Sequence, residues 1–350
     1  MAKLKVGLIG CGWLAQSVHL RILTHMPDVE VVALAEPDAQ RQVEASRRVP
    51  RADVCGSYHE LLKMPQVEAV LICVPTALHA EVAVAALEQG KHIYLEKPLA
   101  TNLDEAQRVM AAWRRAGVVG MTGFNYRFNP LFQSACQTIR SGRLGALVGV
   151  CTAFSTASHS LPAWKRARES GGGVLLDLAS HHVDLVRFLF DQEVQRVSAE
   201  VRSQGADQDT AVLQLRLEDG LPIQSFFSFN SIDEDRFDIY GQAGKLTIDR
   251  YRSWDVEITD AGRTPLHLQR MTQKLKSFVN VPYLFNKMRS PWHEPSFREA
   301  LSRFVSATCG GEKASPDLLD GYRSLEVIWA AEQSAQTGQT VSPMSSAVDL

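Results

Sequence analysis

The sequence predicts an α/β protein that begins with a doubly wound parallel sheet and continues into a second domain of α+β type. Two observations predict the first part. A glycine-rich turn joins a short apolar strand to a helix near the N-terminus, and strands then alternate with helices as far as Phe124. From residue 147 onward, strand-like segments follow one another through short loops, which favours an antiparallel sheet. We therefore expect domains at residues 1–124 and 125–340.

Composition and charge restrict the function classes. The chain has 350 residues, of which 45% are hydrophobic and 22% are charged, as in an ordinary folded protein of two domains. The net charge of −2 gives no broad positive field, so we expect neither nucleic acid nor membrane as a partner. No segment approaches the roughly 18 continuous apolar residues of a membrane helix. The six cysteines form no C-x-x-C pair, which is typical of reduced thiols in a cytoplasmic protein.

The N-terminal turn has the pattern G-x-G-x-x-A, formed by Gly10, Gly12 and Ala15 between a strand and a helix. In this context Gly10 permits the tight turn and Gly12 lets a pyrophosphate approach the backbone, while Ala15 keeps the helix close to the strand. The N-terminus of the helix would hold the phosphates. We expect a dinucleotide here, with Trp13 and Leu14 of the same turn among its contacts.

The second predicted strand, residues 29–35, leads into Glu36. Dinucleotide-binding domains carry an acid at this place, where it hydrogen-bonds the adenosine ribose. Glu36 therefore favours NAD, because its charge would repel the 2′-phosphate of NADP. Since Arg41, Arg47 or Arg48 could still reach such a phosphate, NADP remains the alternative.

Two further strand ends carry groups suited to the cofactor or to chemistry. Pro75 and Thr76 follow a strongly apolar strand and are expected to border the cofactor. His79 opens the next helix, where packing is favoured over catalysis. The following strand ends in Glu96 and Lys97, and a lysine beside a dinucleotide is either a surface residue or a proton-handling group.

Three glycines, Gly171–Gly173, run straight into an apolar helix that carries Asp177, His181 and Asp184. At i, i+4 and i+7 these three residues share one face of an α-helix. A titratable imidazole between two short carboxylates favours a functional cleft, because solvated faces usually carry Lys, Glu and Gln. His182 is turned well away from this face, so His181 is the preferred catalytic histidine.

Together, the glycine turn, the sequence Glu96-Lys97-Pro98 and the pattern G-G-G-x3-D-x3-H-x2-D resemble the glucose–fructose oxidoreductase, inositol dehydrogenase and rhizopine-catabolism (Gfo/Idh/MocA) family. The resemblance spans nearly the whole chain, and the segments 74–79 and 123–130 share it. It implies a Rossmann domain, a second domain with an open, predominantly antiparallel sheet, and NAD(P)-dependent action on sugars or cyclic polyols. The catalytic set that it implies is Lys97, Asp177 and His181. The expected cofactor contacts also include Pro75, Thr76, His79, Glu96 and Lys97.

The substrate side departs from the family pattern at one place. The family often has Trp-Arg before the three glycines, whereas this chain has Trp164 and Lys165, so a bidentate contact to substrate cannot be assumed. Trp164 would either stack on a sugar ring or pack. Lys165 and Arg166 leave room for an acidic or phosphorylated sugar. The expected substrate contacts, rich in donors and acceptors, are Lys97, Asn125, Tyr126, Trp164, Lys165, Asp177 and His181.

The expected reaction is hydride transfer between nicotinamide and a secondary alcohol carbon. His181 would act as general base, Lys97 would hydrogen-bond the same oxygen, and Asp177 would orient the imidazole or bind a neighbouring hydroxyl. A metal site is disfavoured, because adjacent histidines on a helix diverge. A non-catalytic NAD-binding sensor and a redox-neutral NAD-dependent glycoside-processing enzyme remain alternatives, and net NADH production separates them from a dehydrogenase.

Two expectations concern other surfaces. We expect a homodimer or homotetramer formed through the C-terminal sheet. The segment 269–295 mixes basic and aromatic side chains, which favours a loop over the active site or a subunit contact over an RNA or membrane surface.

Overall fold

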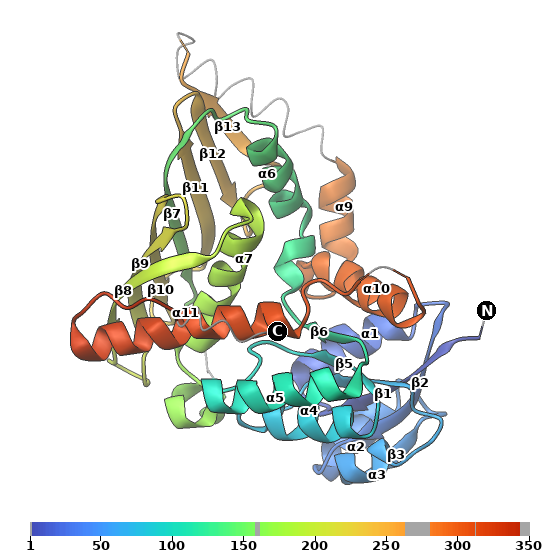
Figure 1. The fold of residues 1–350 in the computed structure, drawn as a ribbon. Helices are drawn as coiled ribbons and strands as arrows, with labels where there is room; N and C mark the ends of the chain where they lie inside the picture. Colours follow the sequence, from blue (N-terminus) through green and yellow to red (C-terminus); the bar gives the residue numbers. More distant parts are fainter. Residues whose placement is uncertain (1, 158–161, 263–280, 312, 344–350) are drawn as a thin grey trace. The chain divides into compact units, whose positions relative to one another are not determined.

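The computed structural model describes residues 2–157, 162–262, 281–311 and 313–343, and Figure 1 shows the order of its elements. The chain divides into two compact units. The first comprises Met1–Asn125, Glu169–Gly171 and Ser290–Leu325. The second comprises Tyr126–Arg168, Gly172–Arg289 and Glu326–Leu350. The chain thus first leaves the N-terminal unit after Asn125, one residue from the predicted boundary, and returns to this unit twice. The domain limits 1–124 and 125–340 stay a prediction.

The first unit is built on a six-stranded parallel sheet of order β3-β2-β1-β4-β5-β6. Its strands are largely buried, as parallel strands covered on both faces must be. The strand order reverses between β1 and β4, and such sheets bind ligands outside the carboxyl ends of the strands at this point. The predicted doubly wound sheet is confirmed. The strands are β1 (Leu4–Ile9), β2 (Val29–Ala35), β3 (Asp53–Cys55), β4 (Ala69–Ile72), β5 (His92–Leu95) and β6 (Gly120–Thr122).

Helices connect these strands, and their ends follow local sequence signals. The Asn102 side chain accepts a hydrogen bond from the Glu105 backbone at the start of α5, and Gly117 ends that helix at a φ of 63°. Helices α4 and α5 pack against each other (Figure 1). The helices of this unit are α1 (Leu20–Leu23), α2 (Ala39–Ser46), α3 (Tyr58–Leu62), α4 (His79–Glu88), α5 (Leu103–Ala116) and α10 (Ser296–Thr308), with the first part of α11 (Leu318–Thr337).

The second unit is built on a seven-stranded sheet of order β13-β12-β11-β7-β10-β9-β8. Every neighbouring pair is antiparallel except β7 with β10, so the predicted, mainly antiparallel sheet is confirmed. The strand β13 was not predicted. The strands are β7 (Leu147–Ser155), β8 (Val194–Arg202), β9 (Thr210–Leu217), β10 (Pro222–Ser228), β11 (Glu234–Gly241), β12 (Gly244–Asp249) and β13 (Glu257–Asp260).

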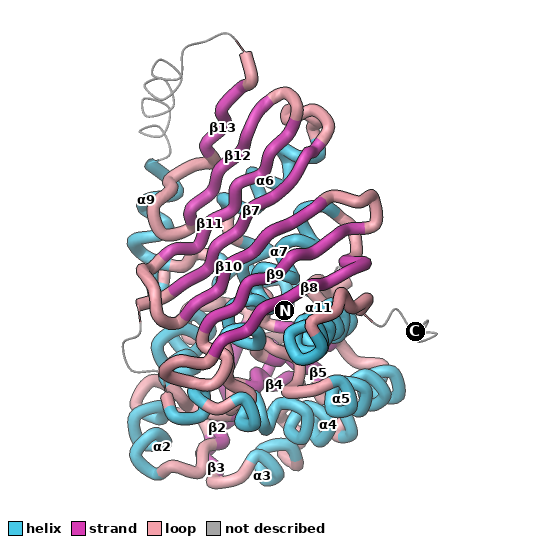
Figure 2. Tube along the Cα trace, turned by 90° about the vertical axis from the view of Figure 1, so that its left-hand side faces the viewer, coloured by secondary structure: helices cyan, strands magenta, loops and turns pink. Residues whose placement is uncertain are grey.

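Two helices, α6 (Pro130–Arg140) and α7 (Ser180–Phe190), pack together on one face of this sheet. Figure 2 looks onto the opposite face, where the central strands lie uncovered. Alternate residues of a strand point to opposite faces, so the buried residues of the strands, most of them apolar, face α6 and α7. The opposite face carries polar residues together with exposed aromatic ones such as Phe226 and Tyr240. The side chains of α7 are therefore packed against α6 and against the sheet.

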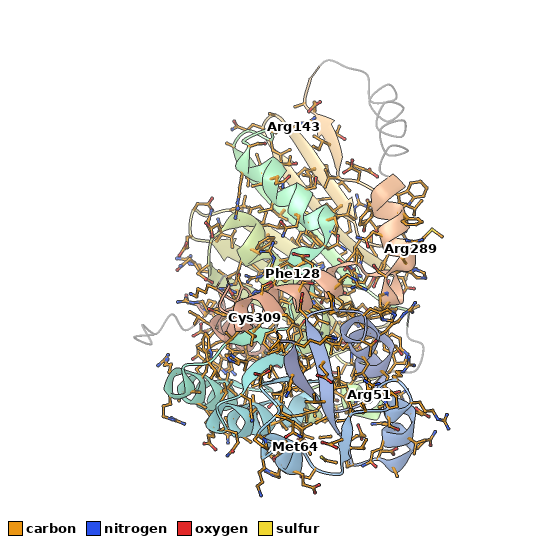
Figure 3. All side chains as sticks on the ribbon, turned by 90° about the vertical axis from the view of Figure 1, so that its right-hand side faces the viewer. Arg51, Met64, Phe128, Arg143, Arg289 and Cys309 are labelled. Carbon is orange, nitrogen blue, oxygen red and sulfur yellow. The ribbon has the colours of Figure 1, made fainter. Side chains whose placement is uncertain are left out.

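The basic and aromatic segment lies partly outside the described residues, which resume at Val281. Its described part begins with α9 (Val281–Arg289), a helix of the second unit. Arg289, labelled in Figure 3, has its guanidinium carbon 3.8 Å from the centre of the Phe285 ring, and Lys287 Nζ donates to the carbonyl oxygen of Arg250 at 2.8 Å. None of the described helices has the length and apolar character needed to cross a membrane.

Candidate active site

The glycine turn has the geometry of a dinucleotide cradle. Gly10 has a φ of +86°, and a Cβ at this residue would lie 2.7 Å from the carbonyl oxygen of Cys73, so only glycine fits. A Cβ at Gly12 would meet nothing within 4 Å, which leaves the backbone open to a pyrophosphate. Ala15 is buried, as close packing of helix on strand requires. These residues therefore fit the dinucleotide that the sequence predicts.

Glu36 follows β2 and lies against this turn. One carboxylate oxygen accepts a hydrogen bond from the Cys11 backbone N–H at 2.7 Å, and the other accepts one from the Asp38 N–H at 3.1 Å. The carboxylate is thus fixed at the end of the strand where an acid can meet a ribose. Burial, together with the Glu36 charge, raises the pKa of the Cys11 thiol to about 12, so Cys11 stays protonated and inert.

Trp13 is exposed and meets a second exposed tryptophan. Its ring lies edge-on to that of Trp292, with ring centres 5.3 Å apart and planes at 79°. Trp292 belongs to the turn η7 (Pro291–His293), a late part of the sequence that lies in the first unit. Trp292 lies in the basic and aromatic segment 269–295 that the sequence singled out, but its contact with Trp13 was not predicted, because no local pattern connects it with the glycine turn. Leu14 is half-buried beside Trp13.

The loops after β4 and β5 are tied together by His79. Its ring is buried, with Nδ1 2.6 Å from the Pro98 carbonyl oxygen and Nε2 3.0 Å from the Val74 carbonyl oxygen. Burial lowers the pKa of His79, which favours the neutral ring. These contacts are those of a packing residue, and one of them, to Pro98, lies beside Lys97. The expected contact of His79 with the cofactor stays a prediction. Thr76 is also buried, whereas Pro75 is exposed.

Glu96 points into the first unit. Its Oε1 lies 2.7 Å from His19 Nε2, and both side chains are buried. A Cβ at Gly123 would lie 2.9 Å from Glu96 Oε2, so the glycine leaves room for the carboxylate. The pair joins the end of β5 to the helix that follows the glycine turn. Glu96 was expected to contact the cofactor, and this contact stays a prediction. His19 was not singled out from the sequence.

Lys97 follows Glu96 and is half-buried. It follows the carboxyl end of β5, and the glycine turn follows the carboxyl end of β1. Because the sheet is parallel, both lie at the side where such sheets bind ligands. Asn125, the last residue of the first unit in this part of the chain, donates from Nδ2 to Ser296 Oγ at 2.8 Å and is buried. The Asn125 amide thus has a structural partner, and its contact with substrate stays a prediction.

The three glycines lead into a π-helical turn of the second unit, Leu175–Ala179, before α7 begins. The predicted α-helix is therefore wrong over its first turn, since π-helical bonds run from i to i+5 and break the 3.6-residue spacing. The predicted stripe is divided among separate partners. Asp177 Oδ2 accepts from Lys165 Nζ at 2.7 Å, whereas buried Asp184 forms a two-bond ion pair with Arg127.

The segment that carries Lys165 lies close to the glycines. A Cβ at Gly172 would lie 2.4 Å from the carbonyl oxygen of Lys165, so only glycine permits this approach. Lys165 Nζ also lies 5.4 Å from the centre of the Trp164 ring, which is half-buried. The lysine that replaces the family's arginine is therefore held as a point charge between Asp177 and an aromatic face.

His181 is buried, with 8% of its surface exposed. Its ring stacks on that of Tyr126, with centres 4.2 Å apart and planes at 19°. His182 faces elsewhere, with Nδ1 3.1 Å from Thr152 Oγ1 and Nε2 3.0 Å from Asp235 Oδ1. The predicted divergence of the two histidines is confirmed, and Asp235 and Thr152 were not predicted.

The candidate residues fall into two groups. The glycine turn, Glu36, Lys97 and their neighbours belong to the first unit. The second unit contains two pairs, His181 stacked on Tyr126 and Lys165 bound to Asp177. Among the described residues, no group of three or more His, Cys, Asp and Glu side chains is arranged to hold a metal ion.

A parallel sheet of this order, with a glycine cradle and an acid after the second strand, defines a dinucleotide-binding protein of Rossmann type. Residues 4–124 match the family described as "Oxidoreductase family, NAD-binding Rossmann fold", and residues 132–247 match the GFO/IDH/MocA C-terminal domain. The chain belongs to the Gfo/Idh/MocA oxidoreductase family, and its N-terminal part is an NAD-binding domain. The resemblance inferred from the sequence is confirmed.

Similar proteins match over almost their whole length. The chain is 26% identical to myo-inositol 2-dehydrogenase of Thermotoga maritima, covering 97% of this chain and 98% of the relative. It is 29% identical to 1,5-anhydro-D-fructose reductase of Ensifer adhaerens, covering 95% and 96%. The WlbA dehydrogenase of Bordetella pertussis, solved in complex with NADH and UDP-GlcNAcA, shares the fold with a TM-score of 0.83 at 21% identity, covering 97% and 98%.

Proposed function

We propose that this protein is an NAD-dependent dehydrogenase that transfers a hydride between nicotinamide and a secondary alcohol carbon of a sugar, sugar derivative or cyclic polyol. The observation that carries the proposal is the position of Lys97. A half-buried amine stands at the carboxyl end of β5, on the edge of the sheet that binds the dinucleotide. A proton-handling group at this edge is what alcohol oxidation requires.

The proposed chemistry assigns one task to each residue. Bound NAD supplies the hydride acceptor. The imidazole of His181 takes the hydroxyl proton as the alcohol is oxidised, and the Lys97 ammonium donates a hydrogen bond to the same oxygen and stabilises its developing negative charge. Asp177 binds a neighbouring hydroxyl or orients the imidazole. The proposal requires Lys97 and His181 to act on one bound substrate.

The cofactor side of the proposal includes the turn residues and the residues after β4. We propose that Gly12, Trp13 and Leu14 contact the pyrophosphate through the backbone, and that Glu36 binds the adenosine ribose. The residues after β4 and β5 would border the nicotinamide. These are Pro75, Thr76 and His79 after β4, and Glu96 and Lys97 after β5.

The substrate class is supported by the relatives and by the second unit. The relatives named above act, by their names, on an inositol and an anhydrofructose. Lys165 and Asp177 offer a donor and an acceptor at 2.7 Å from each other, and Trp164 offers an aromatic face. Such groups suit the adjacent hydroxyls of a ring. Tyr126 and Asn125 complete the proposed substrate contacts.

The test is net formation of NADH, followed by absorbance, with a panel of inositols, aldoses, uronic acids and nucleotide sugars. We expect stoichiometric reduction of NAD by at least one ring substrate. A sensor would bind NAD without turnover, and a redox-neutral enzyme would change the sugar without accumulating NADH. Either of these results would refute the dehydrogenase.

Glu36 is expected to set the cofactor preference. The wild-type protein should have a higher kcat/KM with NAD than with NADP, because the fixed carboxylate repels a 2′-phosphate. Glu36→Ser should narrow this ratio by at least about tenfold, and steady-state kinetics with both cofactors measure it. Glu44→Ser, which removes an exposed acid from the neighbouring helix α2, is the matched control. A wild-type preference for NADP would show that the downstream arginines dominate.

We further propose a cytoplasmic homodimer or homotetramer that uses the uncovered face of the seven-stranded sheet. This face carries exposed Phe226 and Tyr240 and a hollow of about 610 Å³ that Arg196, Gln214 and Gln224 help to line. Extended sheet faces with exposed aromatic side chains are suited to contact with a second copy.

A further inference from the structure

The ring of Tyr126 lies between two other planar groups. The His181 imidazole is stacked on it at 4.2 Å between ring centres, and the guanidinium carbon of Arg250 lies 4.1 Å from the centre of the same ring. Two planar groups at these distances cannot fit side by side on one face of a phenol ring, so they occupy opposite faces. His181, Tyr126 and Arg250 therefore form one stack within the second unit.

Arg250 is fixed from several directions, although it follows the end of β12. Its Nε donates to Asp235 Oδ2 at 2.6 Å, and its backbone N–H donates to the Asp235 carbonyl oxygen at 2.8 Å. Its own carbonyl oxygen accepts from Lys287 Nζ at 2.8 Å. Only 8% of Arg250 is exposed, so the guanidinium has little freedom to leave the Tyr126 ring.

Asp235 anchors the far end of the stack. It is 0% exposed, and its second oxygen lies 3.0 Å from His182 Nε2. Burial acts to raise the pKa of Asp235, but the Arg250 charge and the His182 hydrogen bond outweigh burial and hold that pKa below its usual range. The Asp235 carboxylate is therefore charged, and it keeps Arg250 in place.

We propose that Arg250 is a positioning residue for His181, which fixes the plane of the imidazole through Tyr126 and, by its permanent charge, favours the neutral form that can accept a proton. The inference rests on the proposed role of His181 as general base. A guanidinium does not lose its proton in a protein, so its charge is constant over the working pH range. A nearby positive charge disfavours protonation of an imidazole, and tight packing holds a catalytic group in its productive orientation.

The charged and titratable groups that flank His181 in the sequence each have a partner. Asp177, one turn earlier, is bound by Lys165, and Asp184, one turn later, is bound by Arg127. His182 on the next position of α7 is directed to Asp235. Arg250 is itself paired with Asp235, but of the two charged groups in this ion pair it is the guanidinium that lies over the Tyr126 ring. The positive end of that pair therefore faces the stack.

The test compares two replacements of Arg250 by kcat, by KM and by the pH dependence of kcat/KM. The general base must be neutral to act, so activity rises with pH through its pKa. Arg250→Met removes the charge and the stack, and should lower kcat about tenfold and move this rise to higher pH by about half a unit or more. Arg250→Lys keeps the charge, so its rise should stay near that of the wild type while kcat falls. KM for NAD should change little in both.

Three further variants separate positioning from folding. Arg252→Met removes a 59% exposed arginine from the same turn and should leave kcat and the pH profile unchanged. Since Arg250→Met leaves the buried Asp235 charge unpaired, the double variant Arg250→Met/Asp235→Asn is measured beside it, with thermal unfolding of each. Tyr126→Leu breaks the stack without touching the ion pair and should also lower kcat.

Wild-type kcat and an unshifted pH profile in the folded Arg250→Met or double variant would overturn the inference. If His181→Ala is inactive in the same assay, this result overturns the role of Arg250 alone. Normal turnover of His181→Ala would instead overturn the proposed base, and the positioning role with it. A loss of kcat in the Arg250 variants with an unchanged pH profile would show that the stack acts through orientation and would overturn the effect of the charge.

Discussion

Replacement of His181 by alanine is expected to lower kcat at least about 100-fold while NAD affinity stays close to that of the wild type. General acid–base catalysis contributes about 10²- to 10⁴-fold, and among the described residues of the second unit the one other imidazole, His182, is directed to Thr152 and Asp235. Lys97→Ala is expected to have an effect of similar size. Steady-state kinetics give kcat, and calorimetric titration with NAD gives the affinity.

The controls address stability, because His181 is buried and stacked on Tyr126. Thermal unfolding of His181→Ala shows whether the variant is folded, and His181→Asn keeps a polar side chain of smaller size at the same place. His25→Ala, at an exposed histidine of the first unit, should behave as the wild type. Normal turnover by a folded His181→Ala protein would rule out this histidine as the general base.

Local signals account for the parts of the fold that the sequence predicts well. Helix α6 has strong local determinants, because Pro130 stands in its first turn and the Asn129 side chain caps it by accepting from the Leu131 N–H at 2.9 Å. Strand β9, one of the strand-like segments expected after residue 147, has buried apolar residues that alternate with more exposed and mostly polar ones. Elements with strong local determinants need little information from the rest of the chain.

Elements without such determinants were missed or misjudged. The strand β13 has the short sequence Glu257–Asp260 with no apolar alternation, and it exists because it pairs with β12. The π-helical turn Leu175–Ala179 was read as α-helix, since apolar periodicity does not distinguish a single widened turn.

The residues of the candidate site likewise differ in whether local sequence signals predict them. Gly10, Gly12 and Glu36 could be predicted because a motif and a strand end fix their places. Arg250 and Asp235 could not, because their importance depends on a strand pairing that brings them to a residue far away in the sequence, and the His19–Glu96 pair depends on packing across the first sheet. Long-range contacts between polar residues leave no periodic trace in the sequence.

The proposed substrate contacts lead to the second large effect. Lys165 and Asp177 are bound to each other and only partly exposed, so each must find a partner on the substrate if binding separates them. A ring with adjacent hydroxyls supplies these partners, whereas an aliphatic alcohol leaves the ammonium and the carboxylate without them. Sites that hydrogen-bond a substrate hydroxyl reject analogues that lack it by about 10⁴-fold or more.

We therefore expect kcat/KM for the best ring polyol or pyranose, free or nucleotide-linked, to exceed that for 2-butanol by at least about 10³-fold. NADH formation with both substrates at the same NAD concentration measures the ratio. Lys165→Met should reduce it, because the variant loses the donor but keeps a side chain of similar length that can still pack beside Trp164. If uronic acids are among the best substrates, Lys165→Met should lower kcat/KM for them more than for neutral sugars, since the lost ammonium carries the positive charge. Comparable kcat/KM values for 2-butanol and the best ring substrate would contradict a site built to pair hydroxyls.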